Sequence, residues 1–524
     1  MPSTWTALPV RLEAVCAGLK FPDAPFHAEN LHANRGNIWQ RLPNGTAGSM
    51  GYKLSHVPSN MVVAACQKLP FTGDLRVHPR YRQTCRVCAS PNLAPVIDLG
   101  AQYLQGSFIK PGSLMPPARK LRTELVRCDV TQNENGCGLL QLAHSFPPPI
   151  LYANYWYRSG TNATMRGHLA DITRDALATV GKPTPVVLDI GCNDGTLLAN
   201  YPAGTKRYGI DPSDIAREVG GDVQIINTLF PSEQATEILP QGGIDIITSI
   251  AMFYDLESPT EFAAAVANLL SGDGIWVFEM SYLPLMLLQN SFDTICHEHL
   301  EYYSLAVLEE IMMRAKLRIF KASIHEINGG SLRCYACRGS SNTYSSEQDS
   351  SFLQRLRIRE FEMELDTDKP YAAFQARIER LRDELNALLF RIRASGGRIH
   401  IYGASTKGNV LLQWYSITRV IVDCAADRNP AKAGSRTLGT EIPIVTEEES
   451  RAAKPDYYLV LPWHFKKEFL ERERETIFAG TKMIFPLPEV EIVSKDNYET
   501  ALRAAAEGSG SLQRLLLGEA PSGR

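Results

Sequence analysis

The sequence predicts an α/β protein with two doubly wound, Rossmann-like sheets and a small cysteine-rich module in front of them. Three observations support this fold class. Strand-like and helix-like segments alternate over residues 168–338. A short apolar strand runs into a glycine-containing loop twice, once near residue 190 and again near residue 402. Two pairs of cysteines lie between residues 85 and 137, upstream of both sheets.

Length and composition limit the function classes. The chain has 524 residues, which is too long for one hydrophobic core, so about three domains are expected. Its net charge of -3 gives no reason to expect a nucleic-acid partner. No apolar run has the length of a membrane span, and residues 1–20 lack the apolar centre of a signal peptide. The odd cysteine number, 11, favours reduced thiols, and we expect a cytoplasmic protein.

Composition and periodicity divide the chain into six segments. Residues 351–395 have apolar positions at helical spacing, with a break near Lys369-Pro370, and are expected to be helices. The leader has weak periodicity, and we assign it no role. The expected segments are a poorly ordered leader at 1–80, the cysteine module at 81–150, the first sheet domain at 151–345, a helical linker at 346–395, the second sheet domain at 396–495 and a tail at 496–524.

The cysteine module is predicted to bind zinc. Cys85 and Cys88 form a close Cys-x-x-Cys pair, and Cys128 and Cys137 form a wider second pair. Four thiolates suit tetrahedral Zn²⁺, although the cysteines could also be reduced and unligated. We favour zinc because a short segment with few large apolar residues cannot form a sufficient hydrophobic core and needs a cross-link, such as a bound metal, to stay folded. Four protein ligands leave no open position on the metal, so its role would be structural.

The first sheet domain is predicted to bind a cationic nucleoside. A strand at 186–190 leads into a glycine loop, and the next strand, at 207–211, ends in an acid that suits ribose hydroxyls. The loop has no cation for a pyrophosphate, and its acids would repel phosphate but attract a cation. This pattern favours S-adenosylmethionine over an ordinary strand–turn–helix. The candidate binding residues are Asp189, Gly191, Asn193, Asp194, Gly195 and Asp211.

Three more strands are expected in this domain, at 244–250, 274–279 and 331–337, the last as an antiparallel addition. Ligands should lie at the carboxyl ends of the strands. Tyr157 belongs to an aromatic stretch over 152–168 that precedes the sheet. We expect this stretch to form a lid over the ligand, and the alternative is plain packing against the cysteine module.

The second sheet domain is predicted to bind a phosphate. Its first strand, at 398–402, leads into a second glycine loop, and further strands are expected at 420–423 and 457–461. The loop brings hydroxyl side chains and Lys407 to the start of a helix, and this combination favours a phosphate. The alternative is a degenerate duplicated domain that serves only for packing.

Residues 293–303 hold two histidines and two glutamates, just after a strand that is expected to end at Glu279. His297 and His299 are two positions apart, which does not match the zincin motif and would place them on different sides of a helix. Histidine titrates near neutrality, and a neighbouring carboxylate can orient it, so a proton-transfer site is favoured. A metal site and a polar surface loop are the alternatives.

These motifs together resemble the three-domain sugar C-methyltransferases, S-adenosylmethionine-dependent enzymes that methylate nucleotide-linked keto-deoxysugars. The resemblance covers residues from about Thr84 to Val493. It is carried by the four cysteines with Cys-Gly-Leu-Leu-Gln-Leu at 137–142, Asp-Ile-Gly-Cys-Asn-Asp-Gly at 189–195, Cys-His-Glu-His-Leu at 296–300, Gly-Gly-Ser-Leu-Arg at 329–333, Tyr-Gly-Ala-Ser-Thr-Lys-Gly-Asn at 402–409 and Leu-Pro-Trp at 461–463. It implies a class I methyltransferase fold between an N-terminal zinc module and a C-terminal Rossmann-like domain.

The resemblance also implies residue roles. His299 is the expected general base, with Glu298 beside it and Tyr157 in support. Some family members have a tyrosine where this chain has Cys296, which leaves open the group that supports the enolate. The second sheet domain is then expected to hold a nucleotide diphosphate, with its lysine near the phosphates. The residues expected to contact the substrate are Cys296, His297, Gly403, Ser405, Lys407 and Asn409.

The expected reaction is C-methylation of a nucleotide-activated 4-keto-deoxysugar, next to the ketone and at carbon-3 by the habit of the family, through an enolate. Methylation of a hydroxyl and a non-catalytic scaffold that retains the fold are the alternatives. The expected partner is the nucleotide-linked sugar, with neither nucleic acid nor membrane. We expect a monomer or a homodimer.

Overall fold

The computed structural model describes residues 37–41, 52–56, 79–113, 120–131, 135–147, 151 and 158–519 of the chain. The chain forms two units, Met1–Leu75 and Arg76–Arg524. In the first unit, strand β1 (Asn37–Arg41) pairs in antiparallel register with β2 (Tyr52–His56). The rest of this unit lies outside the described residues, so the low order expected of the leader stays a prediction.

The first sheet domain is built on a seven-stranded sheet in the order β11-β10-β9-β12-β13-β16-β15. Strands β11, β10, β9, β12 and β13 are mutually parallel, and β16 is antiparallel to both of its neighbours, β13 and β15. The five predicted strands, including the antiparallel addition, are confirmed, and β11 and β15 are additional. The strands are β9 (Val186–Ile190), β10 (Lys206–Ile210), β11 (Val223–Ile226), β12 (Ile244–Ile250), β13 (Leu270–Ser281), β15 (Leu317–His325) and β16 (Ser331–Arg338).

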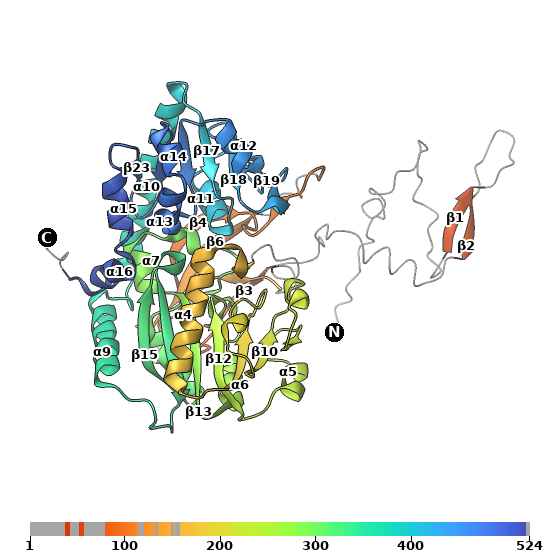
Figure 1. Ribbon diagram of the computed structural model, residues 1–524, viewed down its shortest axis with the longest axis vertical. Helices are drawn as coiled ribbons and strands as arrows, with labels where there is room; N and C mark the ends of the chain where they lie inside the picture. The colour runs from red at the N-terminus through yellow and green to blue at the C-terminus, as the bar shows by residue number, and fades with distance from the viewer. Residues whose placement is uncertain are drawn as a thin grey trace, which may run out of the picture. The chain divides into compact units, whose positions relative to one another are not determined.

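Both faces of this sheet are covered because successive side chains of a strand point to opposite faces. Val187 is buried in one cluster with Ile172 of helix α4, which Figure 1 shows lying across the sheet. Its neighbour Leu188 is buried in a second cluster with Phe262 of α6 and Leu308 of α8. The predicted doubly wound arrangement is therefore present. The helices are α4 (Ala163–Val180), α5 (Glu233–Ile238), α6 (Pro259–Leu269), α7 (Leu283–Leu288) and α8 (Leu305–Arg314).

The linker is helical, and its break falls where the sequence predicts it. Helix α9 (Glu347–Glu362) ends before α10 (Lys369–Ala394), and Pro370 lies in the first turn of α10, where its missing N–H costs no helical hydrogen bond. The buried side chains of α10 recur every three or four residues and join the core of the second sheet domain. They are Tyr371, Phe374, Ile378, Leu381, Leu385, Leu389 and Ile392.

The second sheet domain has a six-stranded sheet in the order β20-β18-β17-β21-β22-β23, with β23 antiparallel to β22. The strand predicted at 420–423 is wrong, since the strand lies at Cys424–Asp427, and Val420 is 75% exposed. The apolar run belongs instead to a turn in which Val422 N–H donates to Thr418 O. The strands are β17 (Ile399–Tyr402), β18 (Cys424–Asp427), β20 (Ile444–Thr446), β21 (Tyr457–Val460), β22 (Lys482–Phe485) and β23 (Glu491–Val493).

Six further helices pack around this sheet and along the tail. The helix α11 (Thr406–Trp414) follows β17 directly and begins at the second glycine loop. The others are α12 (Glu447–Ala452), α13 (Lys466–Arg472), α14 (Arg474–Phe478), α15 (Tyr498–Ala505) and α16 (Gly508–Leu517). Within the described part of the chain, no helix combines the length and the apolar character that a bilayer crossing requires.

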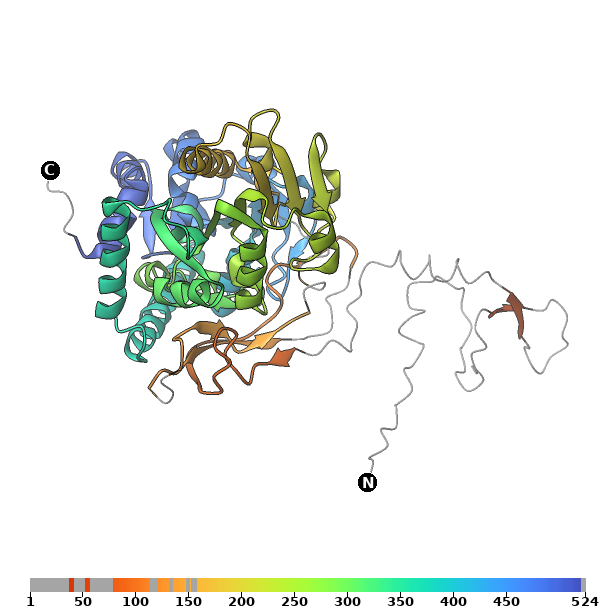
Figure 2. The same ribbon diagram turned by 90° about the horizontal axis from the view of Figure 1, so that it is seen from below.

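The cysteine module is joined to both sheet domains by strand pairing. Its four-stranded sheet has the order β14-β7-β6-β4, and β14 (Glu301–Tyr302) comes from the first sheet domain. A further short strand, β5, pairs with β19 of the second sheet domain, and Figure 2 shows the module running beneath the rest of the unit. The module strands are β3 (Arg80–Tyr81), β4 (Leu93–Gln102), β5 (Phe108–Ile109), β6 (Leu121–Cys128), β7 (Leu140–Leu142) and β8 (His144–Ser145), and β19 is Arg436–Thr437. The segment that leads into β14 therefore connects the first sheet domain to the cysteine module.

Candidate active site

The first glycine loop, residues 191–195, is fixed at the carboxyl ends of β9 and β10. Gly191 N–H donates to Ile210 O at 2.7 Å, and its φ of +80° is favourable only for glycine. The Asp211 carboxylate accepts two backbone N–H bonds, from Asn193 at 2.9 Å and from Ser213 at 2.8 Å. The predicted ribose acceptor thus stands beside the glycine loop, as the strand order requires.

Two side chains of this loop hold the chain that precedes α4. Asn193 Oδ1 accepts the Ser159 N–H at 3.0 Å, and Asp194 Oδ2 accepts the Gly160 N–H at 2.8 Å. Tyr157 lies just upstream but outside the described residues, so its supporting role and the aromatic lid stay predictions. The glycine loop is nevertheless hydrogen-bonded to residues 159–160, just after Tyr157.

Buried acids give the loop a preference for a cation. Asp189 is 3% exposed, and its carboxyl accepts a hydrogen bond from Thr248 Oγ1 at 2.6 Å. Burial raises the pKa of Asp189, the Thr248 hydrogen bond lowers it and the charge of Asp211 raises it, with a net pKa of about 7. A bound cation would stabilise the ionised carboxylates. These residues therefore fit the cationic nucleoside predicted from the sequence.

His299 is held in the tautomer that a base requires. Its Nδ1–H donates to Thr294 O at 2.7 Å, so the lone pair of the neutral ring is on Nε2. The ring lies 4.4 Å from the ring of Tyr254, between centroids. Burial, together with the positive charge of Lys407, lowers the pKa of His299 to about 3, against the hydrogen bond to Thr294 that raises it. The imidazole is therefore neutral at pH 7, with Nε2 unprotonated.

His299 lines a cavity at the carboxyl edge of the first sheet. Side chains from β13, α7, β14 and the short helices η5 (Phe253–Asp255) and η6 (Phe292–Thr294) surround it. Sequence reasoning missed Tyr254 and Thr294, although Tyr254 follows the carboxyl end of β12, where ligands gather. The lining residues are Tyr254, Ser281, Tyr282, Leu283, Met286, Thr294, His299, Glu301 and Tyr302.

The neighbours of His299 turn away from this cavity. His297 is 1% exposed, and its ring nitrogens lie 3.0 Å from His144 Nε2 and 3.2 Å from Gln102 O, both in the cysteine module. Cys296 is fully buried among apolar side chains. Neither side chain is among the cavity-lining residues. In this structure these two side chains pack against the cysteine module and the apolar core, and their contact with a substrate stays a prediction.

Glu298 also faces the cysteine module. Its carboxylate accepts the Gly106 N–H, and a Cβ at Gly106 would lie 1.8 Å from Glu298 Oε1, so a larger residue there would displace the carboxylate. Burial raises the pKa of Glu298 to about 7. The Thr294 carbonyl, rather than Glu298, orients the His299 ring. The partnership expected between Glu298 and His299 is therefore replaced by a backbone contact.

The second glycine loop divides its side chains between domains. Ser405 caps α11 by accepting the Gly408 N–H at 3.0 Å, and Gly403 has a φ of +86° beside Pro462. Asn409 is buried, and its Nδ2 donates to Gln105 O of the cysteine module at 2.6 Å. Lys407 Nζ donates to Asn328 O of the first sheet domain at 2.9 Å. Ser405 and Gly403 are thus at the loop, whereas Lys407 and Asn409 reach across to other domains.

A second acid repeats the arrangement of Asp211. Asp427 ends β18, and its carboxylate accepts the N–H groups of Ala404 at 2.9 Å and of Asn429 at 2.8 Å. Lys432 Nζ lies 3.2 Å from the same carboxylate. Sequence reasoning missed Asp427 because it placed the strand four residues too early. With the strand at 424–427, the acid stands at the position that binds ribose in Rossmann-like folds.

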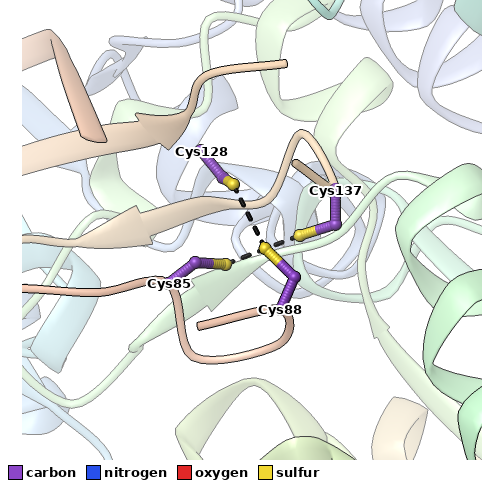
Figure 3. A group of neighbouring side chains, drawn as sticks. All are labelled: Cys85, Cys88, Cys128 and Cys137. Carbon is purple, nitrogen blue, oxygen red and sulfur yellow. Dashed lines mark hydrogen bonds between the residues drawn. The ribbon is translucent and has the colours of Figure 1, made fainter. Parts of the chain in front are cut away.

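Four sulfurs converge in the cysteine module (Figure 3). Cys85 and Cys137 Sγ are 3.5 Å apart, as are Cys88 and Cys128 Sγ, and all four lie within 4.8 Å of one another. A tetrahedral Zn²⁺ with bonds of about 2.3 Å needs sulfurs about 3.8 Å apart, so the four thiolates fit zinc. Four protein ligands close the coordination sphere, which makes the metal structural.

Comparison with known proteins matches the three domains in chain order. A zinc-binding-domain family profile matches residues 85–152, a methyltransferase-domain profile matches residues 162–321, and a C-methyltransferase C-terminal-domain profile matches residues 326–488. The chain is 26% identical over 418 residues to C-methyltransferase NovU of Streptomyces niveus, which covers 79% of this chain and 97% of NovU. The chain thus carries a zinc-binding domain, a methyltransferase domain and a C-methyltransferase C-terminal domain, in that order.

Solved structures similar to this C-methyltransferase match about one third of its length. Magnesium protoporphyrin IX methyltransferase from Synechocystis PCC 6803 is 16% identical, with 34% of this chain and 88% of that chain covered and a TM-score of 0.27. An S-adenosylmethionine-dependent methyltransferase from Mesorhizobium loti is 17% identical, with 32% and 96% covered and a TM-score of 0.27.

The matched domains give the two predicted ligands their roles. The C-methyltransferase takes its methyl group from S-adenosylmethionine, and the cysteine module carries a structural zinc. Four protein ligands leave no open position on the metal, so zinc supports the architecture and takes no part in methyl transfer.

The zinc centre predicts one zinc per chain in the purified protein, by atomic absorption. Cys88→Ser removes one thiolate and should lower the bound zinc to well under half an equivalent and lower the thermal midpoint, because metal binding contributes directly to folding. Cys424→Ser is the matched control, since this half-buried cysteine lies in β18. Full activity and stability in a zinc-free preparation would contradict the structural role.

The methyl-donor loop predicts that Asp211→Asn weakens S-adenosylmethionine binding by about 10- to 100-fold, because a charged acceptor is worth roughly 1.5–3 kcal/mol. Isothermal titration calorimetry measures this affinity. Asp214→Asn is the control, since its side chain is exposed and pairs with Arg217. Equal affinity in both variants would show that Asp211 does not contact the ribose.

Proposed function

We propose that this C-methyltransferase methylates a nucleotide-linked 4-keto-deoxysugar at the carbon next to the ketone, namely carbon-3. The observation that carries the proposal is the neutral His299, whose Nδ1–H is committed to Thr294 O while Nε2 keeps its lone pair. Methylation at carbon next to a carbonyl begins with loss of a weakly acidic C–H proton, which requires such a base.

The residues of the cavity have different roles in the proposed reaction. His299 Nε2 accepts the proton from the carbon, while Tyr254 packs against the imidazole and limits its orientation. Burial of the lining residues excludes water, which strengthens electrostatic effects on the developing enolate oxygen. S-adenosylmethionine, when bound at the first glycine loop, supplies the electrophilic methyl carbon.

The second sheet domain is proposed to hold the nucleotide. Asp427 beside Ala404 supports ribose binding, because it repeats the hydrogen bonding of Asp211 beside Asn193. The start of α11, with Ser405 as its cap, offers backbone N–H groups and a positive helix end for the diphosphate. A nucleotide held there would carry its sugar toward the seam between the two sheet domains. We further propose a cytoplasmic location, since the zinc thiolates require a reducing compartment.

Product analysis tests the proposed reaction. The protein is incubated with ¹³C-methyl-labelled S-adenosylmethionine and a panel of nucleotide-linked keto-deoxysugars, and the products are examined by NMR. We expect a C–CH₃ signal on the carbon next to the ketone. A methoxy signal would identify a hydroxyl as the acceptor, and donor binding without any transfer to the panel would exclude this substrate class.

The base assignment predicts that His299→Ala lowers methyl transfer by at least about 10³-fold and leaves the affinity for S-adenosylmethionine within about twofold. Glu298→Gln should retain activity within about tenfold, because its carboxyl group accepts a hydrogen bond from Gly106. Steady-state kinetics and calorimetry measure the two quantities. Near-wild-type turnover of His299→Ala would remove His299 from the mechanism.

The pH profile gives an independent check on His299. A base with a pKa lowered from 6.5 to about 3 stays unprotonated well into the acid range. We therefore expect no loss of kcat/KM from protonation of this base between pH 8 and about pH 6, whereas an ordinary histidine would lose activity near its usual pKa. A single protonation near 6.5 that His299→Ala abolishes would contradict the lowered pKa.

A further inference from the structure

We propose that Lys407 is a catalytic residue, which holds the carbonyl oxygen of the substrate and stabilises the enolate oxygen while His299 removes the proton. The inference rests on the proposed function and deepens it, because it assigns the oxyanion partner within the same site. It moves Lys407 from the predicted phosphate site to the reacting end of the sugar.

Lys407 extends from its own domain into the other one. It is the second residue of α11, yet its Nζ donates to Asn328 O of η7 (Ile327–Gly329) in the first sheet domain. Asn328 has a φ of +59°, a left-handed backbone conformation uncommon for a residue other than glycine. The Lys407 ammonium group, carried by α11, is thus hydrogen-bonded to a left-handed turn of the first sheet domain. Figure 1 shows α11 at the border between the two sheets.

The same seam carries the group that orients the base. Trp463 Nε1–H, from η9 (Trp463–Phe465) of the second sheet domain, donates to Asp293 Oδ2 at 2.9 Å. Asp293 directly precedes Thr294, whose carbonyl holds the His299 ring. Lys407 is close enough that its charge lowers the pKa values of both His299 and His464. Lys407 and the segment that carries His299 therefore meet at one seam, because Lys407 binds Asn328, the neighbouring Gly329 lies against Trp463, and Trp463 binds Asp293.

The ammonium group of Lys407 has N–H donors available for a ligand. Lys407 is half-buried, and among the described residues Nζ has a single hydrogen-bond partner and forms no ion pair. An ammonium has three N–H donors, so two remain for a ligand. Asp293 Oδ1 and His464 Nδ1 are buried nearby without a partner in the described part of the chain. A buried polar group without a hydrogen-bond partner costs free energy of folding. Such groups are therefore typical of a site where a polar ligand supplies the missing hydrogen bonds.

The surroundings favour a carbonyl oxygen over a diphosphate. The buried carboxyl of Asp293 acts on Lys407, and a second anionic group of high charge would be repelled there. A ketone is neutral in the ground state and gains one negative charge only as the proton leaves. A fixed ammonium then stabilises the transition state more than the bound substrate, which is the requirement for faster chemistry.

The electron balance of the step is simple. The C–H electron pair next to the ketone becomes the C=C bond as the proton moves to His299 Nε2. The carbonyl π pair moves to oxygen, where a Lys407 N–H donates to it. No oxidant or further reactant is needed, and the ketone re-forms when the carbon is methylated.

Solvent exchange tests this role separately from methyl transfer. The holoenzyme is mixed in D₂O with each nucleoside-diphosphate keto-deoxysugar of the panel, and with S-adenosylhomocysteine in place of the methyl donor. NMR then follows replacement of the proton next to the ketone by deuterium. We expect Lys407→Met and Lys407→Ala to slow this exchange by about 10²- to 10³-fold, with KM changed less than about fivefold. Lys407→Arg should recover part of the rate.

The control and the outcomes separate the rival roles. Lys467→Ala removes an exposed lysine of α13 in the same domain and should exchange like the wild type. Unchanged exchange in Lys407→Met, with KM raised tenfold or more, would return Lys407 to the phosphate site and overturn the inference. Lys407→Met nearly preserves the length of the side chain, so it serves as the test if Lys407→Ala fails to fold. The thermal unfolding midpoint of each variant shows whether it is folded. Absence of both exchange and methyl transfer in the wild type would instead reject the proposed function.

Discussion

The active site depends on one constraint, the strand pairing that holds residues 295–302 against the cysteine module. Glu301 pairs with Gln141 and Tyr302 with Leu140, so β14 completes a sheet that belongs otherwise to the module. Cys128 ends β6, the neighbour of β7, and its N–H donates to Leu139 O. Zinc therefore fixes two strands, and these fix the strand that immediately follows His299. The structural metal thus helps to position the proposed base, His299, through backbone hydrogen bonds.

Arg86 strengthens this support from within the Cys-x-x-Cys turn. Its guanidinium donates to Leu142 O at 2.8 Å and to Ser145 Oγ at 2.9 Å, and its Nε lies 3.6 Å from Glu301 Oε1. Both side chains of that ion pair are fully buried, and Glu301 lines the cavity. A buried pair of this kind is poor evidence for extra stability, since removal from water costs about as much as the attraction returns. Its effect is to fix which conformation the turn, β14 and the cavity adopt together.

The sequence predicts the elements that follow local rules. Apolar runs bounded by glycine mark β9 and β12 with their correct limits, and the Cys-x-x-Cys spacing identifies the metal site. The strand at 420–423 is misplaced because Ile421 and Val422 are buried in a turn, and periodicity does not distinguish a buried turn from a strand. The expected link between Glu298 and His299 rests on adjacency, whereas residues 296–299 form a turn in which the two neighbouring side chains contact different parts of the protein.

Contacts between domains leave no local signature, so the sequence could not indicate them. The hydrogen bonds of Lys407 with Asn328 and of Asn409 with Gln105 join positions 79 and 304 residues apart. These bonds, with the β5–β19 and β7–β14 pairings, link the three domains in a closed circuit. Hinge opening between the two Rossmann-like units would have to break the Lys407 bond together with the links between the cysteine module and one of the units. The domains are thus cross-linked on two sides, an arrangement that favours substrate entry by local rearrangement over a wide hinge motion.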